Sequence, residues 1–171
     1  AGRVFIHENP AHAKSWALSC IKRIMREAGV HVVEADQCMF GLKTWGKNRS
    51  QLVLAKKPTK FMTNSVHIAR SSSKRCGGKG GYCSRAKRGA HALCNGDRAK
   101  AAAIYPFALC RAILTGFRDQ MISDGRLAPG SVGLNCVMLD NDDRVSETYW
   151  LAGGGDSPHV LKLKVADNEC F

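Results

Sequence analysis

The chain has 171 residues, of which 44% are hydrophobic and 23% charged, so it is long enough for one domain with its own core. No apolar run approaches the roughly 20 residues that span a bilayer, and no secretory signal peptide is recognisable at its start. These features argue against a membrane-spanning protein, and we expect an intracellular location in the cytoplasm or the nucleus.

The formal net charge of +12 is distributed unevenly. Residues 140–171 carry seven acids and three bases, a net charge of −4, so the rest of the chain carries +16. Residues 70–100 hold nine bases and one acid, Asp97. A field of this sign attracts polyanions, and nucleic acid is the commonest polyanion in cells. We therefore expect DNA or RNA as a partner, and the alternative is a solvated basic loop without one.

The first elements alternate between strand and helix. Residues 3–7 favour a strand that ends at Pro10, residues 15–28 favour a helix closed by Gly29, and residues 30–33 favour a second strand. A crossover of this length joins parallel strands. The sequence therefore predicts an α/β fold with a partial Rossmann-like parallel sheet and crossover helices.

The later elements are shorter, apart from one long helix. Residues 51–55 and 60–63 favour extended structure, residues 65–72 a short helix, and residues 106–125 the main helix. We expect residues 1–125 to form one α/β module, with a basic Cys/His loop at 70–98. Residues 126–171 are expected to be an irregular acidic tail, either a linker or the start of the next module.

Four potential zinc ligands lie within 19 residues of the basic loop: Cys76, Cys83, His91 and Cys94. Thiolates and imidazole are the ligands that tetrahedral zinc prefers, and the Gly-rich residues 77–81 would let the chain wrap around an ion. The spacings match no standard zinc finger, and a flexible loop with incidental thiols is the alternative. Zinc held by all four side chains would be structural, because no position is left for water.

Cys38 follows the second expected strand. A stabilised thiolate there could be a nucleophile, but no histidine is fixed nearby in the sequence, which favours a buried structural thiol. The length, the helical content and the missing signal peptide all argue against a disulfide scaffold. We expect the thiols to be reduced.

The expected nucleic-acid contacts come from two basic segments. Lysines before a proline-fixed turn can reach phosphates as flexible point charges, and so can the bases of the loop; an exposed hairpin corner is the alternative for the first segment. The expected contacts are Lys56, Lys57, Lys74, Arg75, Lys79, Arg85, Lys87 and Arg88.

Glu8 and Asn9 follow the first expected strand, at the edge of the sheet where open α/β proteins bind ligands. A carboxylate there can accept hydrogen bonds from an amino group or a ring N–H of a base. The alternative is a strand-ending turn with a solvated Glu8. The sequence contains no phosphate-binding glycine loop between a strand and a helix, and no nucleophile elbow.

Several motifs together resemble a module found in the polyproteins of copia-like retrotransposons. They are residues 3–10 (RVFIHENP), 15–16 (SW), 36–41 (DQCMFG), 56–59 (KKPT), 61–64 (FMTN), 104–106 (IYP) and 109–110 (LC). The resemblance covers about residues 2–125. It implies a fragment of a retroelement polyprotein, whose partners would include other segments of that polyprotein.

The order of elements also resembles the C-terminal half of the cytosine-C5 DNA methyltransferase core. In those enzymes the Glu of a Glu-Asn pair holds the flipped cytosine, which implies a catalytic role for Glu8, with Asn9 beside it, as part of a larger enzyme. Those enzymes have Val where Pro10 stands, and their cofactor loop and Pro-Cys nucleophile lie upstream of the region that this chain resembles. S-adenosylmethionine is therefore expected only if an upstream half is present.

The expected function is a nucleic-acid-associated binding module without complete catalytic machinery, which is not active as an enzyme alone. One alternative is half of a base-modifying enzyme that depends on S-adenosylmethionine. Another is a zinc-stabilised structural spacer.

Overall fold

The computed structural model describes residues 3–46, 51–85, 89–130, 149–150 and 160–161. The chain divides into two compact units, Ala1–Gln120 and Met121–Phe171. In the described part of the second unit, β6 (Tyr149–Trp150) pairs with β7 (Val160–Leu161) in an antiparallel ladder. Most of the expected acidic tail lies outside the described residues.

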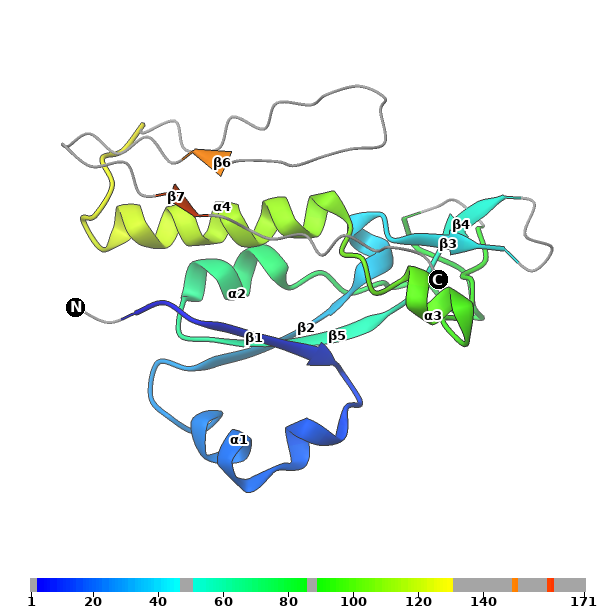
Figure 1. Cartoon of the computed structure of the whole chain (residues 1–171), viewed down its shortest axis with the longest axis horizontal. Helices are drawn as coiled ribbons and strands as arrows, with labels where there is room; N and C mark the ends of the chain where they lie inside the picture. Colours follow the sequence, from blue (N-terminus) through cyan, green and yellow to red (C-terminus); the bar gives the residue numbers. More distant parts are fainter. Residues whose placement is uncertain (1–2, 47–50, 86–88, 131–148, 151–159, 162–171) are drawn as a thin grey trace. The chain divides into compact units, whose positions relative to one another are not determined.

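The first unit is built on a three-stranded sheet in the order β1-β5-β2 (Figure 1). These strands are β1 (Ile6–Pro10), β5 (Pro58–Thr63) and β2 (His31–Asp36). β5 pairs with both neighbours in antiparallel register. The α/β class is confirmed, but the expected parallel Rossmann-like sheet is wrong.

β5 is the most buried of the three strands, as its place in the centre of the sheet requires. Phe61, Met62 and Thr63 are buried at its end, and Thr59 is fully buried as well. β1 and β2 do run in the same direction, since each is antiparallel to β5. Only their common direction agrees with the expected crossover, because β5 lies between them in the sheet. Pro10 is tolerated inside β1 because an edge strand needs no N–H there.

The connection from β1 to β2 contains a 3-10 helix (Lys14–Ala17) and the short helix α1 (Ser19–Ile24), where a single longer helix was expected. α1 has no buried residue. The connection is anchored instead by Trp16, which is 7% exposed and donates a 3.0 Å hydrogen bond from Nε1 to the carbonyl oxygen of Pro10. Lys60 lies over the Trp16 ring at 5.5 Å, so the contact reaches the central strand.

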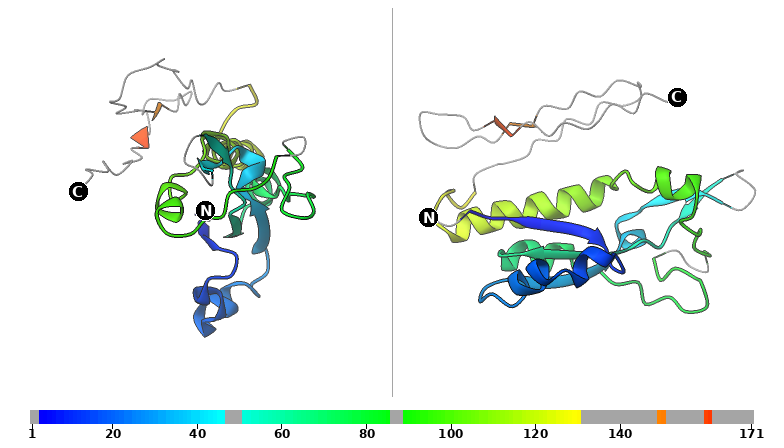
Figure 2. Two further views of the ribbon diagram at one scale, coloured as in Figure 1. Left: turned by 90° about the vertical axis from the view of Figure 1, so that its right-hand side faces the viewer. Right: turned by 60° about the horizontal axis from the view of Figure 1, so that its bottom comes forward.

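Two helices cover the other face of the sheet, opposite α1 in Figure 1. They are α2 (Val66–Ser72), which the side chain of Ser65 caps, and α4 (Phe107–Ser123). α2 runs alongside α4 in Figure 1 and in the right-hand view of Figure 2. The main hydrophobic core of this layer is formed by Ala35, Phe40, Phe61 and Leu109.

A small hairpin extends the sheet layer at the end where β2 finishes. It consists of β3 (Lys43–Trp45) and β4 (Leu52–Leu54), and α3 (Asp97–Ala101) lies beside it (Figure 1). The basic loop returns along β4, because the N–H of Ala92 donates to the carbonyl oxygen of Leu54 at 2.8 Å. The Cys/His-rich segment is thus bound to the hairpin by backbone contacts.

Gly116 sets how closely α4 can approach α2. A Cβ at this position would lie 2.7 Å from Ile68 Cα and 2.8 Å from the carbonyl oxygen of His67. Gly116→Ala gains about 1 kcal/mol of helix propensity, but backbone atoms cannot yield as a flexible side chain can, and overpacking typically costs about 1–3 kcal/mol. We expect the overpacking to outweigh the propensity gain, so that the free energy of unfolding falls, by up to about 2 kcal/mol, in urea titrations.

Arg111→Ala, at an exposed position of α4, is the control and should change that free energy by no more than about 0.5 kcal/mol. An unchanged or higher stability of Gly116→Ala would show that the two helices are not packed at this distance.

Candidate metal centre

Three thiols and one imidazole converge at the end of β2. Cys38 comes from the 3-10 helix Gln37–Phe40, which directly follows β2, and Cys76, Cys83 and His91 come from the basic loop. The ligand atoms of these four side chains all lie within 4.8 Å of one another. We call this group the Cys3His cluster.

The distances between the ligand atoms fit a tetrahedral zinc site. Cys76 Sγ lies 3.9 Å from Cys83 Sγ and 3.7 Å from His91 Nε2. Zinc bonds of about 2.3 Å to sulfur and about 2.0–2.1 Å to nitrogen place two sulfur ligands about 3.8 Å apart, and sulfur and nitrogen about 3.5 Å apart. The donor set is also one that zinc prefers. The Cys3His cluster could therefore hold a metal ion with little rearrangement.

His91 has the correct ring nitrogen available for a metal. Its Nδ1 lies 3.0 Å from the carbonyl oxygen of Gly81, which can only accept a hydrogen bond. The proton therefore belongs on Nδ1, and the lone pair of Nε2 faces the thiols. A backbone carbonyl that fixes the tautomer of a ligating histidine is a usual outer-sphere feature of zinc sites.

The thiols differ in how readily they ionise. Burial alone raises the pKa of Cys76, but hydrogen bonds from the side chain and backbone of Ser84 stabilise its thiolate and lower the pKa to about 6. Burial raises the pKa of Cys38 well above its usual range, and the neighbouring charges of Cys83 and Cys76 raise it further. Three thiolates in one buried place repel one another, and a divalent cation is the group that removes this repulsion.

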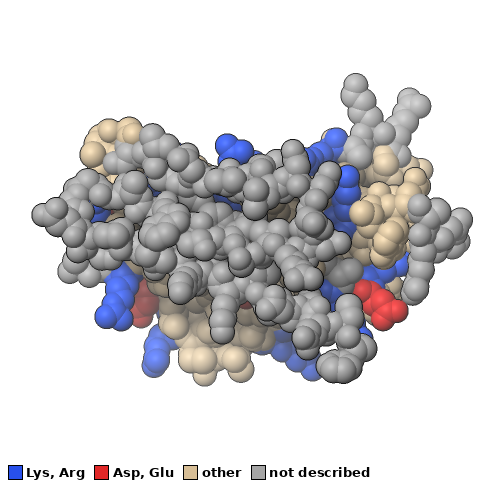
Figure 3. Space-filling model, turned by 45° about the horizontal axis from the view of Figure 1, so that its top comes forward, with Lys and Arg blue, Asp and Glu red and all other residues tan. Residues whose placement is uncertain are grey.

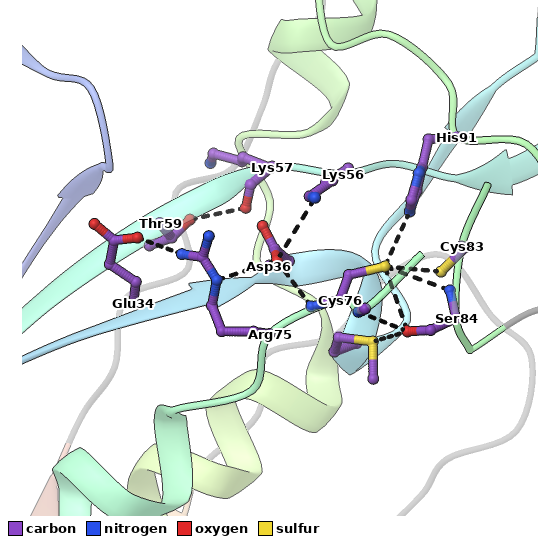
Figure 4. A network of polar contacts seen from close by, with 12 residues as sticks. Glu34, Asp36, Lys56, Lys57, Thr59, Arg75, Cys76, Cys83, Ser84 and His91 are labelled. Carbon is purple, nitrogen blue, oxygen red and sulfur yellow. Dashed lines mark hydrogen bonds and ion pairs between the residues drawn. The ribbon is translucent and has the colours of Figure 1, made fainter. Parts of the chain in front are cut away.

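A buried carboxylate connects the cluster to the sheet (Figure 4). Asp36, at the end of β2, is fully buried and accepts a 2.8 Å hydrogen bond from the backbone N–H of Cys76. Its Oδ2 also lies 3.4 Å from Arg75 Nε and 3.9 Å from Lys56 Nζ. Arg75 pairs in addition with Glu34 on β2. The first ligand of the loop is thereby held against the strand that leads to Cys38.

The glycines of the loop allow Cys76 and Cys83 to meet. A Cβ at Gly78 would lie 1.9 Å from the carbonyl oxygen of Tyr82, so only glycine fits where the loop closes on itself. Gly80 and Gly81 have φ values of +61° and +82°, which side chains rarely adopt. The shape of the loop thus requires glycine at positions 78, 80 and 81.

The structure brings together three of the four expected ligands. Cys94 lies apart from them and packs against a small apolar group of Leu42, Ala55 and Ala102, where burial raises its pKa. Cys38, which the sequence favoured as a structural thiol, takes the fourth place. Sequence spacing could not reveal it because it lies 38 residues before Cys76; a thiol directly after a strand end was the available signal.

The expected catalytic residues lie in β1, the edge strand. Glu8 accepts a hydrogen bond from the hydroxyl of Tyr105, and its Oε1 is buried without a hydrogen-bond partner among the described residues. Burial and this contact raise the pKa of Tyr105, which keeps the hydroxyl protonated. Asn9 Nδ2 lies 3.1 Å from His7 Nε2. Neither residue belongs to the Cys3His cluster.

The expected nucleic-acid contacts divide into two groups. Lys56 and Arg75 are paired with buried or nearby carboxylates, as described above. The others lack a carboxylate partner within the described part of the chain: Lys57 donates to the carbonyl oxygen of Ala102, Lys74 lies over the Phe40 ring, Arg85 donates to the carbonyl oxygen of Met39, and Lys79 is exposed. Lys87 and Arg88 lie outside the described residues.

Comparison with known proteins finds no matching family model, no matching curated protein and no matching solved structure. Within the described residues, no helix has the length and apolar character needed to cross a membrane.

The ligand set predicts different behaviour for two cysteines of similar chemistry. Cys38→Ser removes a ligand, so the zinc affinity should fall by more than the roughly 10–100-fold that losing an outer-sphere partner costs. Cys94→Ser is the control and should bind one zinc per chain as tightly as the unmodified protein. Competition titration against a chromogenic chelator measures both. The assignment of Cys38 is wrong if the two variants behave in the opposite way.

The tight closure at Gly78 gives an independent test with a matched neighbour. Gly78→Ala forces the loop open, and we expect zinc affinity to drop at least about tenfold and the zinc-dependent rise in Tm to shrink, since binding energy also stabilises the fold. At Gly77 a Cβ meets nothing within 4 Å, so Gly77→Ala should leave both quantities unchanged. Equal losses in the two variants would contradict this geometry.

Proposed function

We propose that the chain is a zinc-stabilised nucleic-acid-binding module of a retroelement polyprotein, without catalytic activity of its own. The observation that carries the proposal is the Cys3His cluster, which fastens the basic loop to the end of β2. A metal at this position would give a fixed shape to a segment rich in positive charge. An ordered basic surface binds a polyanion with less entropic cost than a flexible one.

The charge distribution supports a polyanionic partner. The chain carries +16 outside residues 140–171. On the face drawn in Figure 3, the described part of the surface shows more Lys and Arg than Asp and Glu. Lys74, Lys79 and Arg85 of the basic loop have no carboxylate partner among the described residues, so their charges are available to phosphates. Lys56 pairs with Asp36, and Arg75 pairs with both Asp36 and Glu34, so these two cations hold the loop against β2.

The retroelement origin is supported by the sequence motifs that span residues 2–125. An enzyme half with a methyltransferase-like core has less support, because its parallel sheet is replaced by an antiparallel one. In addition, the carboxylate of Glu8 accepts a hydrogen bond from the hydroxyl of Tyr105. Binding of a base by Glu8 would require this carboxylate to be free at an open strand end. The described residues therefore favour the binding module.

The proposal predicts salt-sensitive and zinc-dependent binding. With zinc bound, the affinity for mixed-sequence fluorescent oligonucleotides should fall with salt, with a log–log slope of about −2 or steeper if three or more phosphates are contacted. Cys83→Ser, which loses a ligand, should bind the oligonucleotides at least about tenfold more weakly at the same salt concentration, because a less ordered loop loses more conformational entropy on binding. Fluorescence anisotropy over a salt series measures both effects.

Cys94→Ser is again the matched control and should retain the binding of the unmodified chain. The proposal is abandoned if the zinc-loaded protein binds neither single-stranded nor duplex nucleic acid. If zinc binds but does not change the affinity for nucleic acid, the zinc site serves only the structure of a spacer.

A further inference from the structure

A large groove lies beside the Cys3His cluster. Its volume is about 1060 Å³, at the upper limit of the roughly 300–1,000 Å³ typical of small-molecule sites, so an extended ligand suits it better. The hairpin β3–β4 forms one wall and residues 89–95 form another. His91, one of the four potential ligands, also lines it.

The charged side chains of the groove are all basic. Lys43, Arg85 and Arg98 line it, and its described lining contains no carboxylate. None of the ion pairs between described residues involves these three cations. Arg85 donates to the carbonyl oxygen of Met39, a contact that positions the guanidinium without neutralising it. The groove is therefore complementary to a chain of negative charges.

Gly41 allows Arg85 to take this place. A Cβ at Gly41 would lie 2.9 Å from Arg85 Nη1, and the φ value of Gly41 is +90°. The guanidinium thus lies against a backbone position where a side chain would displace it. Because Arg85 follows Cys83 by two residues, the same loop that carries a metal ligand presents this cation to the groove.

The hairpin adds an aromatic surface to the charge. Lys43 is paired with Leu54 and Trp45 with Leu52, and since alternate residues of a strand share a face, all four lie on one face of the hairpin. Lys43, Leu52 and Leu54 line the groove, and Trp45, which is the cross-strand partner of Leu52, lies next to that lining at the rim. Trp45 is 47% exposed, so its ring is accessible to a stacking base.

We propose that this groove binds single-stranded nucleic acid, with a base stacked on Trp45 and phosphates held by Lys43, Arg85 and Arg98. Exposed aromatic rings combined with a basic groove are the features by which proteins bind single strands without reading their sequence. A duplex keeps its bases stacked inside, so it could use the cations but not the ring. This inference rests on the proposed function and names the surface through which it acts.

The test uses the zinc-loaded full chain and a fluorescent 12-nucleotide strand of mixed sequence, as DNA and as RNA, with a duplex hairpin for comparison. Trp45→Ala should weaken binding of the single strand by about 5- to 100-fold, the loss of one stacked base, while the affinity for the duplex changes little. Trp45→Phe keeps an aromatic ring and should restore most of the affinity. Phe107→Ala, which removes a ring of equal exposure outside the groove, should have no effect.

Charge variants test the cations independently of the ring. Lys43→Gln and Arg98→Gln should each make the log–log salt slope less steep by about 0.7, as expected when one phosphate contact to a single strand is lost. Lys22→Gln, at an exposed position of α1, is the control and should leave the slope unchanged. Zinc content and Tm, measured for every variant, separate a loss of contact from a loss of fold.

The outcomes separate the two proposals. Absence of any nucleic-acid binding by the unmodified protein overturns the proposed function and this inference with it. Binding that is unchanged by the substitutions of Trp45, Lys43 and Arg98 is compatible with the proposed function but overturns the assignment of the groove as its binding surface. Preference for the duplex, with the same sensitivity to the cations, also overturns the single-strand assignment.

Discussion

The convergence of three buried thiols and one imidazole at the end of β2 is the arrangement on which the position of the basic loop depends. Cys38, Cys76 and Cys83 are each less than 10% exposed, and their charges cannot coexist there without a cation. The described residues of the basic loop between α2 and α3 form no helix or named strand, and they meet the sheet layer at this point and along β4. A bound metal would reinforce the small cluster that Cys38, Cys76 and Cys83 form with Met39 and Leu54.

Asp36 links the three-stranded sheet to the Cys3His cluster. It lies where β2 ends, and its carboxylate receives the N–H of Cys76 together with the side chains of Lys56 and Arg75. A charge that is fully buried is tolerated only when it is paired and hydrogen-bonded in this way. The position of β2 is in turn set by the buried central strand β5, so the burial of residues such as Phe61 helps to determine where the first ligand lies.

Local features of the fold were predictable from the sequence, but its long-range pairings were not. Periodicity correctly indicated α2, α4 and most strands, because this signal comes from neighbouring residues. The place of β5 between β1 and β2 follows from the burial of most of the strand, which alternation alone does not reveal. In the site, Cys76, Cys83 and His91 were found by their proximity in sequence, whereas Cys38 required the fold. The pairing of Arg75 with Glu34 was equally hidden, since 41 residues separate them.

His91 belongs to two places at once, because it is a potential metal ligand and a part of the groove wall. Two sites that share a side chain are thermodynamically linked, and the linkage is reciprocal. An occupant of the groove could favour the orientation of the His91 ring that ligation needs. In that case the occupant increases the metal affinity by the same factor by which the metal increases the affinity for the occupant. The affinity of the module for its partner would then depend on the supply of metal around it, through the orientation of one side chain.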